Sequence, residues 1–254
     1  MLWDHPDEER RIYDINCELM IPKIIHFCWL SGDPYPMLIK HCIRHWQRVM
    51  PGYEIRKWDT HTFDLSRSPW VREAFDCKKY AFAADYIRAY ALYSEGGWYF
   101  DSDLWLKRDI TPLSGDRFVS CMECYTNDGA EGGIQAAFLG SEAGHPFLRD
   151  VLEYYDRQHF VRGDGMMATS PIAPAIYADM ARKYGFMQKN EIQRLAEGMV
   201  IYDSSVCAPN RSADSSESYA IHFCEHSWHD TNSFKRVMHK LRGLSRTVRI
   251  YLSD

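Results

Sequence analysis

The chain has 254 residues and a formal net charge of −5, so we expect one large α/β domain rather than two small ones. Hydrophobic residues make up 46% and charged residues 26%, which excludes wholesale disorder. The acidic balance argues against a general nucleic-acid binder, whose surface has to attract phosphate. The charge is uneven, because residues 231–254 hold six basic residues and one acid, whereas residues 1–230 hold the other 24 basic and 34 acidic residues.

The first part of the chain predicts a β-α-β unit. Residues 21–30 form a short apolar run rich in β-branched side chains, which is typical of a buried strand. Residues 31–36 contain two prolines and predict a loop. Residues 37–49 place apolar side chains on one helical face, and a Pro-Gly pair follows them. Residues 53–59 predict a second strand, so the opening favours a layered α/β fold.

The rest of the chain continues this alternation. The strongest predicted helix is 77–95, which has many good helix formers and a Gly-Gly pair after it. Residues 203–218 contain six serines and predict a mobile loop. We expect further strands at 98–106, 117–124, 134–139 and 219–224, further helices at 145–158 and 174–185, and a Gly-rich loop at 161–171.

The start of the chain and its cysteines favour the reducing cytoplasm. The first residues, MLWDHPDEERR, lack the apolar stretch of a secretory signal, and no window resembles a membrane-spanning helix. Eight cysteines in a chain of this kind are typical of reduced thiols. Cys121 and Cys124 form a lone C-x-x-C, which leaves a zinc site or a redox pair as the weaker interpretation.

Two acids, Asp101 and Asp103, interrupt an apolar strand. The residues before them, Trp98-Tyr99-Phe100, favour burial, and a buried carboxylate is costly without a partner. Two carboxylates in a D-x-D spacing can meet one hard cation if the chain turns there, and such oxygen ligands suit Mg²⁺ or Mn²⁺. A surface turn with two acids is the plainer alternative.

Asp85 and Arg88 are three residues apart on the preceding predicted helix, so they share a face. That face also carries Ala81, Ala84 and Leu92, which should look inward. An exposed ion pair would contribute only a few tenths of a kcal/mol to the helix. A buried pair beside the D-x-D acids instead favours recognition of a polar substrate.

The block KKYAFAADYIRAYALYSEGGWYFDSD, residues 78–103, closely resembles the signature of glycosyltransferase family 32, whose members transfer sugars and carry a DXD motif. Weaker similarities extend in order over residues 21–228. The resemblance implies an α/β fold of GT-A type, a single domain over 1–230 with a Rossmann-like mixed central sheet flanked by helices, plus added helices and a basic C-terminal tail over 231–254. The nucleotide-sugar site is also similar to that of the large glucosylating toxins.

The resemblance implies roles for individual residues. Trp29 matches the residue that stacks on the nucleotide base, and Phe27 belongs with it to the nucleotide-sugar set. Asp85 and Arg88 match the pair that holds the donor sugar and the diphosphate. The expected catalytic and binding set also includes Asp101 as a metal-side acid, Asp103 as the direct metal ligand, Tyr99 beneath the metal or the sugar, and Ser227 and Trp228 at the diphosphate.

The resemblance implies that the third metal ligand is a histidine near the end of the last strand, because related nucleotide-sugar folds take one from a strand and loop of this type, and neutral imidazole is a possible ligand of such a cation. His222 is favoured and His226 is the alternative. The sequence departs from the family at Thr169-Ser170-Pro171 and at Cys207, both in regions expected to shape the acceptor side. The acceptor is therefore the least determined part of the prediction.

The predicted function is transfer of a hexose, with retention, from a nucleotide sugar to a saccharide in bacterial surface polysaccharide or glycolipid synthesis. We expect Mn²⁺ or Mg²⁺ as cofactor and a UDP-hexose as donor, such as UDP-galactose, UDP-glucose or UDP-N-acetylglucosamine. The alternative is a mannosyltransferase that uses GDP-mannose as its donor. Two further alternatives remain. One is a non-catalytic carbohydrate-binding or membrane-associated protein with the same fold, and the other is a metal-dependent hydrolase that uses the same acids.

The basic end of the chain predicts an amphipathic helix. Residues 234–252 place six apolar side chains on one stripe with six basic residues around it. This pattern is typical of a helix that binds an anionic membrane surface, which would suit a lipid-linked acceptor and a peripheral position at the inner face of the membrane. A helix packed on the domain with its basic face in water is the alternative.

Overall fold

The computed structural model describes residues 21–124, 132–208 and 214–224 of the chain. A mixed eight-stranded sheet lies at its centre, with the strand order β2-β1-β3-β7-β5-β9-β8 and with β6 paired to β5. The strands of this sheet are β1 (Ile24–Cys28), β2 (Glu54–Trp58), β3 (Gly97–Phe100), β5 (Phe118–Cys124), β6 (Gly132–Ile134), β7 (Phe138–Ser141), β8 (Gln193–Arg194) and β9 (Met199–Tyr202). A second, three-stranded sheet has the order β10-β11-β4, with β4 at Leu104–Leu106, β10 at Cys207–Ala208 and β11 at Ala220–His222.

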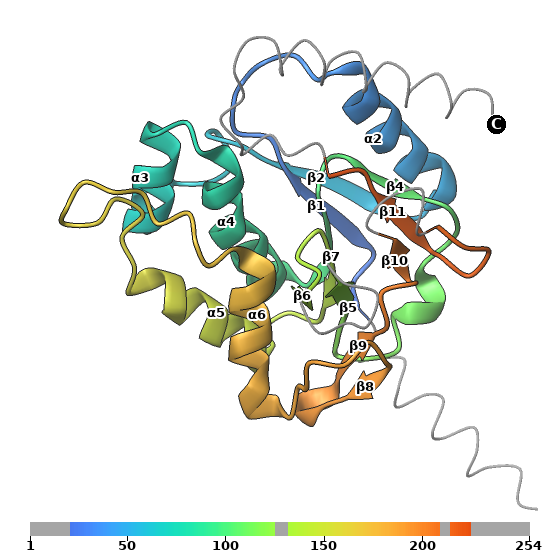
Figure 1. Ribbon diagram of the computed structural model, residues 1–254. Helices are drawn as coiled ribbons and strands as arrows, with labels where there is room; N and C mark the ends of the chain where they lie inside the picture. Colours follow the sequence, from blue (N-terminus) through green and yellow to red (C-terminus); the bar gives the residue numbers. More distant parts are fainter. Residues whose placement is uncertain (1–20, 125–131, 209–213, 225–254) are drawn as a thin grey trace, which may run out of the picture.

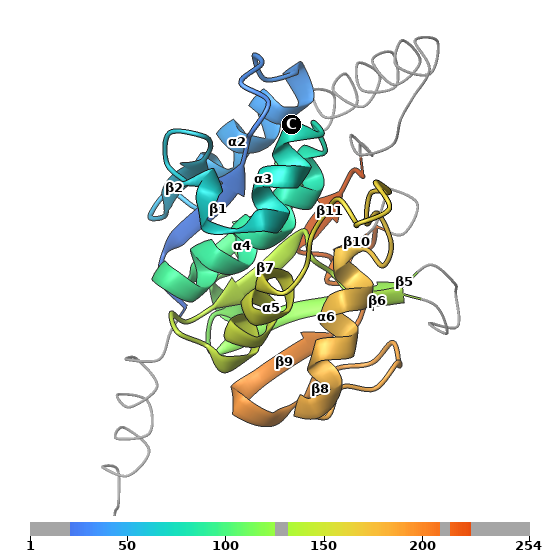
Figure 2. The ribbon, with the colours of Figure 1, turned by 90° about the vertical axis from the view of Figure 1, so that its left-hand side faces the viewer.

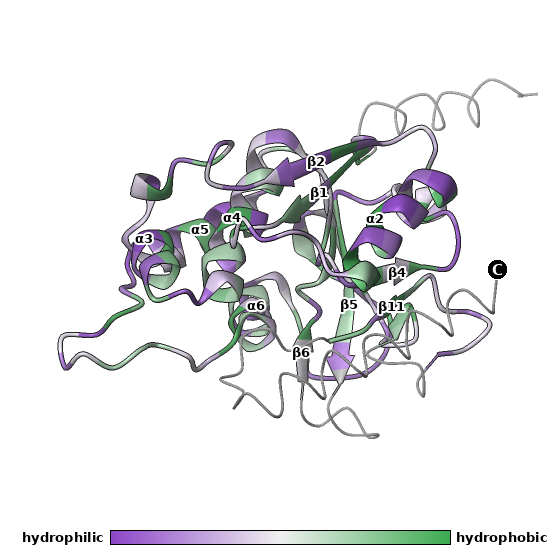
Figure 3. Cartoon of the chain, turned by 90° about the horizontal axis from the view of Figure 1, so that it is seen from above, coloured by the Kyte–Doolittle hydropathy of each residue, from purple (hydrophilic) through white to green (hydrophobic). Residues whose placement is uncertain are grey.

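Helices and the small sheet cover the two faces of the central sheet (Figure 1). One face carries α3 (Pro69–Asp76), α4 (Tyr80–Glu95), α5 (Pro146–Asp156) and α6 (Ala173–Ala181), which lie together in front of the sheet in Figure 2. The other face carries α2 (Met37–Val49) and the small sheet. Figure 3 shows these three layers from above, with the more hydrophobic segments in green.

The two faces of the sheet have separate hydrophobic clusters. In the first, Phe118 and Leu139 from the sheet pack with side chains of α3–α6, among them Phe147. In the second, Trp98 and Phe138 pack with α2 and the small sheet. The sheet is therefore buried on both sides, which explains the nearly continuous apolar runs of its central strands.

The two best-defined predicted helices are confirmed. α2 spans the same residues as the predicted helix 37–49, and its buried side chains follow the helical spacing. α4 ends at Gly96, whose amide donates to the carbonyl of Leu92 and whose φ of 65° is easy for glycine. A Cβ on Gly96 would also lie 2.8 Å from the amide nitrogen of Ala143, so this tight turn requires glycine.

Three predicted elements are wrong in part. The predicted strand 98–106 is two strands, because the chain turns at 101–103 and β4 joins the other sheet. The predicted strand 134–139 divides into β6 and β7, which both pair with β5. The predicted loop 203–218 contains the short strand β10, and its residues 209–213 lie outside the described part.

Within the described residues, the sequence prediction also lacks α3, β8, β9 and the short 3₁₀ turns at 65–67, 111–113 and 196–198. The predicted helices 145–158 and 174–185 are confirmed as α5 and α6, the latter followed by a 3₁₀ turn at Arg182–Tyr184. The predicted C-terminal helix, residues 234–252, lies outside the described residues. In the part of the chain that the structure describes, no helix is both long and apolar enough to span a bilayer.

Candidate active site

The two acids of the D-x-D motif lie in the turn that joins the two sheets. This turn follows β3 of the central sheet and is closed by the Leu104 amide, which donates to the Asp101 carbonyl at 2.9 Å. The Asp101 amide donates to the carbonyl of Ala137 at 3.1 Å, so the first acid stays attached to the central sheet. The side chain of Asp103 is 11% exposed and that of Asp101 is 28% exposed. Both carboxylates therefore lie at the carboxyl end of a buried strand, where α/β sheets commonly bind ligands.

His222 reaches the same turn from the other end of the chain. It ends β11, which runs antiparallel to β4, and it is paired in register with Leu104. Its Nε2 atom lies 3.3 Å from Oδ1 of Asp103 and 3.7 Å from Oδ2 of Asp101. One ligand atom from each of the three side chains can be chosen so that all lie within 4.8 Å of one another. The structure thus brings His222 together with the two acids, while the alternative, His226, lies outside the described residues.

The charge state of His222 reflects its acidic surroundings. Burial by itself lowers the pKa of the imidazole, but the nearby Asp103 carboxylate raises the pKa well above its usual value. The other ring nitrogen, Nδ1, lies 3.3 Å from the Sγ atom of Cys224. A positive charge is therefore favoured between the two carboxylates.

The donor atoms of this cluster fit a divalent cation. The two carboxylates suit Mn²⁺ or Mg²⁺, and the imidazole nitrogen is a ligand that Mn²⁺ accepts more readily than Mg²⁺. The acids are close enough that a cation could replace the proton on His222 and leave the imidazole neutral.

Arg88 connects the helix α4 to this cluster. Its Nη2 atom lies 2.9 Å from Oδ1 of Asp85 and 3.5 Å from Oδ1 of Asp101, and its Nη1 donates to the Ala136 carbonyl at 2.7 Å. Arg88 is 5% exposed and Asp85 is 7% exposed, so the pair is buried as the helical spacing predicted. Burial raises the pKa of Asp85 to about 7, against the opposing effect of the Arg88 charge. For Arg88, burial acts to lower the pKa, but Asp101 and other groups raise it well above its usual value.

Tyr99, the third residue of β3, holds the carboxylate of Asp101. Its hydroxyl donates to Oδ1 of Asp101 at 3.0 Å, and the Arg88 guanidinium lies 5.0 Å from the centre of its ring. Cys28, at the end of β1, lies near the same groups, and burial raises the pKa of its thiol to about 12. The thiol is therefore a neutral neighbour of the site.

The predicted nucleotide side of the site is at the end of β1. Trp29 is half-buried, its indole N–H donates to the Asp33 carbonyl at 2.8 Å, and its ring meets Tyr35 edge-on at 5.1 Å. Phe27 is 3% exposed and packs edge-on against Trp46 at 5.7 Å. The side chain of Phe27 thus belongs to the core, and the contacts of both residues with a nucleotide remain predictions.

Glu123 is the group that sequence reasoning missed. It lies on β5 opposite Gly133 of β6. Burial raises the pKa of its carboxyl group, and the charges of His222 and Asp101 also act on it. A single acid in the otherwise apolar strand FVSCMEC was the available signal.

Some predicted residues lie outside the described part of the chain. Ser227 and Trp228 belong to this group, so their contacts with a diphosphate remain predictions. Cys121 is buried in the core, while the side chain of Cys124 is not described. The zinc or redox interpretation of the C-x-x-C is therefore not tested.

Comparison with protein families gives a match. Residues 36–119 match the model of the glycosyltransferase sugar-binding region containing a DXD motif. This segment includes Asp85, Arg88, Asp101 and Asp103 and ends before His222.

Two curated yeast proteins are similar to this chain. An inositol phosphoceramide mannosyltransferase of Schizosaccharomyces pombe is 28% identical over 179 residues, which is 66% of this chain and 48% of that protein. A mannosyl phosphorylinositol ceramide synthase of Saccharomyces cerevisiae is 26% identical over 156 residues, which is 56% of this chain and 37% of that protein. The chain spans half or less of the length of these relatives.

Among solved structures, the PaToxG glycosyltransferase superposes with a TM-score of 0.50 at 14% sequence identity, covering 69% of this chain and 76% of that one. This likeness concerns the fold. Together with the central mixed sheet and its covering helices, it confirms the expected fold class.

Proposed function

We propose that this chain, which carries the DXD-containing sugar-binding region of glycosyltransferases, is a retaining, metal-dependent hexosyltransferase. The observation that carries the proposal is the convergence of Asp101, Asp103 and His222 beside the buried Asp85–Arg88 pair. These groups come from three separate segments of the chain. A purely structural role would not require so many charged groups in one partly buried place, because each of them is costly to desolvate.

A divalent cation held by Asp103, Asp101 and His222 would neutralise negative charge on a departing diphosphate. Tyr99 holds the Asp101 carboxylate through its hydroxyl, which restricts the orientation of that ligand. The second carboxylate, Asp103, is the more buried of the two and faces His222 directly. These residues would hold and orient the cation, and their fixed charges would keep it in place beside the diphosphate.

Arg88 and Asp85 would bind the donor beside the cation. Arg88 is held by Asp85, Asp101 and the carbonyls of Ala84 and Ala136, so its charge is fixed near the place where the diphosphate is expected. Asp85 can accept hydrogen bonds from sugar hydroxyls while it remains paired with Arg88. Retention of configuration is implied by the family resemblance, and a front-face substitution in which the leaving phosphate helps to remove the acceptor proton needs no covalent protein intermediate.

Two donor classes compete. We favour a UDP-hexose, because the site residues resemble those of the glucosylating toxins. The names of two relatives favour GDP-mannose instead, since both refer to a mannosyl product or reaction. Both donors are nucleotide diphosphate sugars, so they place the same demands on the cation and on Arg88.

The acceptor would be a saccharide of a surface polysaccharide or a glycolipid. One yeast relative is named as an inositol phosphoceramide mannosyltransferase and the other as a mannosyl phosphorylinositol ceramide synthase, which supports a glycolipid acceptor. Within this proposal, residues 1–230 form the catalytic domain, and residues 231–254 form a basic tail that would bring it to an anionic lipid surface at the inner face of a membrane.

A nucleotide-release screen tests the proposal. The chain is incubated with UDP-galactose, UDP-glucose, UDP-N-acetylglucosamine or GDP-mannose, with Mn²⁺ or with a chelator, and with or without a mixture of saccharide acceptors. We expect one donor to release nucleotide only with the cation, and faster when an acceptor is present. Release that no acceptor stimulates would favour a hydrolase, and release that is unchanged by the chelator would contradict the metal site.

A further inference from the structure

A groove lies on the side of α4 that faces away from the candidate active site. Its volume is about 620 Å³, within the usual range of small-molecule sites. Three tyrosines of α4, at positions 86, 90 and 93, lie along it, and none of the active-site residues lines it. At about 100° per residue this stripe points well away from Asp85 and Arg88. The groove is lined by Arg67, Tyr86, Tyr90, Tyr93, Ser94, Ala143, Gly144, Arg149, Leu152, Glu153 and Asp156.

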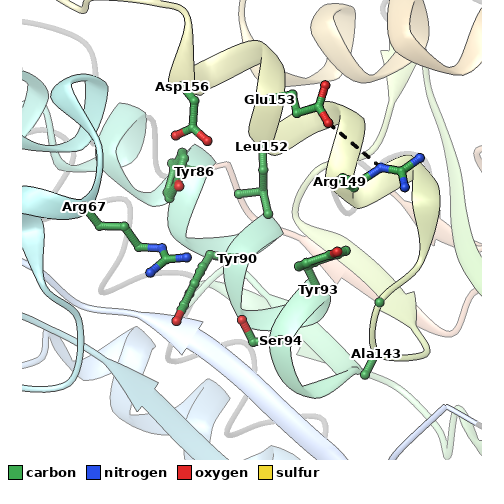
Figure 4. A pocket seen from close by; sticks show the side chains of 11 residues that line it. Arg67, Tyr86, Tyr90, Tyr93, Ser94, Ala143, Arg149, Leu152, Glu153 and Asp156 are labelled. Atoms are coloured by element: carbon green, nitrogen blue, oxygen red, sulfur yellow. Dashed lines mark ion pairs between the residues drawn. The ribbon is translucent and has the colours of Figure 1, made fainter.

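The lining combines aromatic faces with polar groups at the edges. Figure 4 shows the tyrosines between Arg67 on one side and Arg149 and Glu153 on the other. Tyr90 and Tyr93 are half-buried, so part of each side chain is exposed. The Tyr90 ring also meets Trp58 and Phe63 edge-on, at 5.9 Å and 5.3 Å between ring centres. The Arg67 guanidinium lies 4.5 Å from the centre of the Tyr90 ring, which holds that ring in place.

The charges of the groove are balanced. Arg67 and Asp156 both interact with the hydroxyl of Tyr86, and Arg149 lies 4.0 Å from Glu153. Each guanidinium thus has a carboxylate close by. The two arginines and the two acids of the lining balance, so neither an anion nor a cation gains a net electrostatic advantage in the groove.

A lipid chain fits the groove poorly, because apart from the tyrosine rings only Leu152 and Ala143 are apolar. A neutral sugar fits it well. Sugar C–H groups pack on the negative face of an aromatic ring, while guanidinium, carboxylate and hydroxyl groups bind sugar hydroxyls as donors and acceptors. The volume leaves room for more than one sugar ring.

We infer that this groove is a second saccharide site, which binds a neutral oligosaccharide through Tyr90 and Tyr93 and is separate from the donor site. The binding itself does not depend on the proposed transferase activity. For the proposed transferase, the bound saccharide would be a remote part of the acceptor, and this identification alone rests on the proposed function.

Binding of neutral trisaccharides of mannose, glucose and galactose to the full chain tests the inference, measured by saturation-transfer NMR titration without donor and with a chelator present. We expect saturable binding of at least one probe. Tyr90→Ala and Tyr93→Ala should each weaken it about tenfold, because each removes a stacking face. Tyr93→Phe should retain it, since the ring remains.

Two control variants separate this site from the donor site. Asp103→Asn alters the candidate active site and should bind the trisaccharide as the unchanged chain does. Tyr154→Ala removes a half-buried tyrosine of α5 that does not line the groove, and it should also leave binding unchanged. Circular dichroism verifies that every variant is folded.

Three results would overturn the inference: no saturable binding by any of the three probes, binding that survives both tyrosine-to-alanine changes in folded protein, or binding that Asp103→Asn removes. Failure of the donor screen together with intact trisaccharide binding would count against the transferase proposal and leave this site standing.

Discussion

Arg88 is the single residue on which most contacts of the candidate site depend. It pairs with Asp85 inside the protein and also touches Asp101 and the Ala136 carbonyl. Removing one partner of a buried ion pair leaves the other charge without compensation. The stability of the domain and the position of the acids are therefore coupled through this side chain.

Arg88→Met should lower the free energy of unfolding by about 3 kcal/mol or more, because Asp85 would remain buried alone. Urea denaturation measures the change. Arg157→Met is the matched control, since Arg157 is 76% exposed and its pair with Glu153 should contribute under about 1 kcal/mol.

A double variant separates the pair from its surroundings. Asp85→Leu combined with Arg88→Met removes both charges, so its cost should be smaller than the sum of the two single changes. If the costs simply add, the two side chains are not energetically coupled and the description of the buried pair is wrong.

The sequence predicted some of these residues far better than others. The spacing of Asp85 and Arg88 predicted a shared inward face, since helical periodicity is local information. His222 lies more than a hundred residues from Asp103, and only the family resemblance suggested that they meet. Glu123 was missed because its position in the site depends on which strands pair with β5. The local sequence pattern does not predict that pairing.

At the scale of elements, the site depends on the chain leaving one sheet for another. β3 and β4 read as one strand in the sequence because both are apolar, but the turn at 101–103 directs them into different sheets. The short strands β8, β9 and β10 have two to four residues, too few for a periodic signal. In contrast, α2 is flanked by proline on both sides and was predicted to the residue.

One close contact between elements is testable at Gly133. A Cβ at this position of β6 would lie 2.2 Å from the carbonyl oxygen of Pro174 in α6. Gly133→Ala should therefore push α6 away from the sheet and lower stability by about 3 kcal/mol, as measured by urea denaturation.

Gly115→Ala is the control for this change. A Cβ on Gly115 would meet nothing within 4 Å, so its effect should stay within about 0.5 kcal/mol. Equal stabilities of the two variants would show that α6 does not pack on β6 at the described distance.

At the scale of the whole molecule, two buried histidines are held neutral. His26 donates from Nε2 to the Gly96 carbonyl and accepts at Nδ1 from the Trp58 indole, and His145 accepts the Phe147 amide at the start of α5. Burial lowers the pKa of both. Below about pH 6.5 the unfolded state therefore binds more protons at these residues than the folded state. Their contribution to the free energy of unfolding decreases as the pH falls.

The whole stability curve mixes opposite effects. The pKa values of Asp85 and Glu123 are raised by burial, so these two acids bind protons more readily in the folded state and stabilise it as the pH falls. A comparison of variants isolates one histidine. The stability advantage of the unchanged chain over His26→Gln should shrink between pH 7.5 and pH 5.5, by up to about 1.4 kcal/mol per pH unit.

Urea titrations at several pH values measure this difference, and His61→Gln serves as the control because His61 is exposed. A pH-independent difference between the unchanged chain and His26→Gln would mean that burial does not hold His26 neutral.

The proposed activity depends on a cation between the D-x-D acids and His222. The most direct measurement is Mn²⁺-dependent nucleotide release, with the donor found in the screen, for the unchanged chain, Asp103→Asn and Asp76→Asn. Asp76 is an exposed acid of α3 and is the matched control. We predict that Asp103→Asn loses turnover by on the order of 100-fold or more, while its circular dichroism spectrum stays that of the unchanged chain. The turnover of Asp76→Asn should stay unchanged. Near-normal turnover in Asp103→Asn would contradict the account.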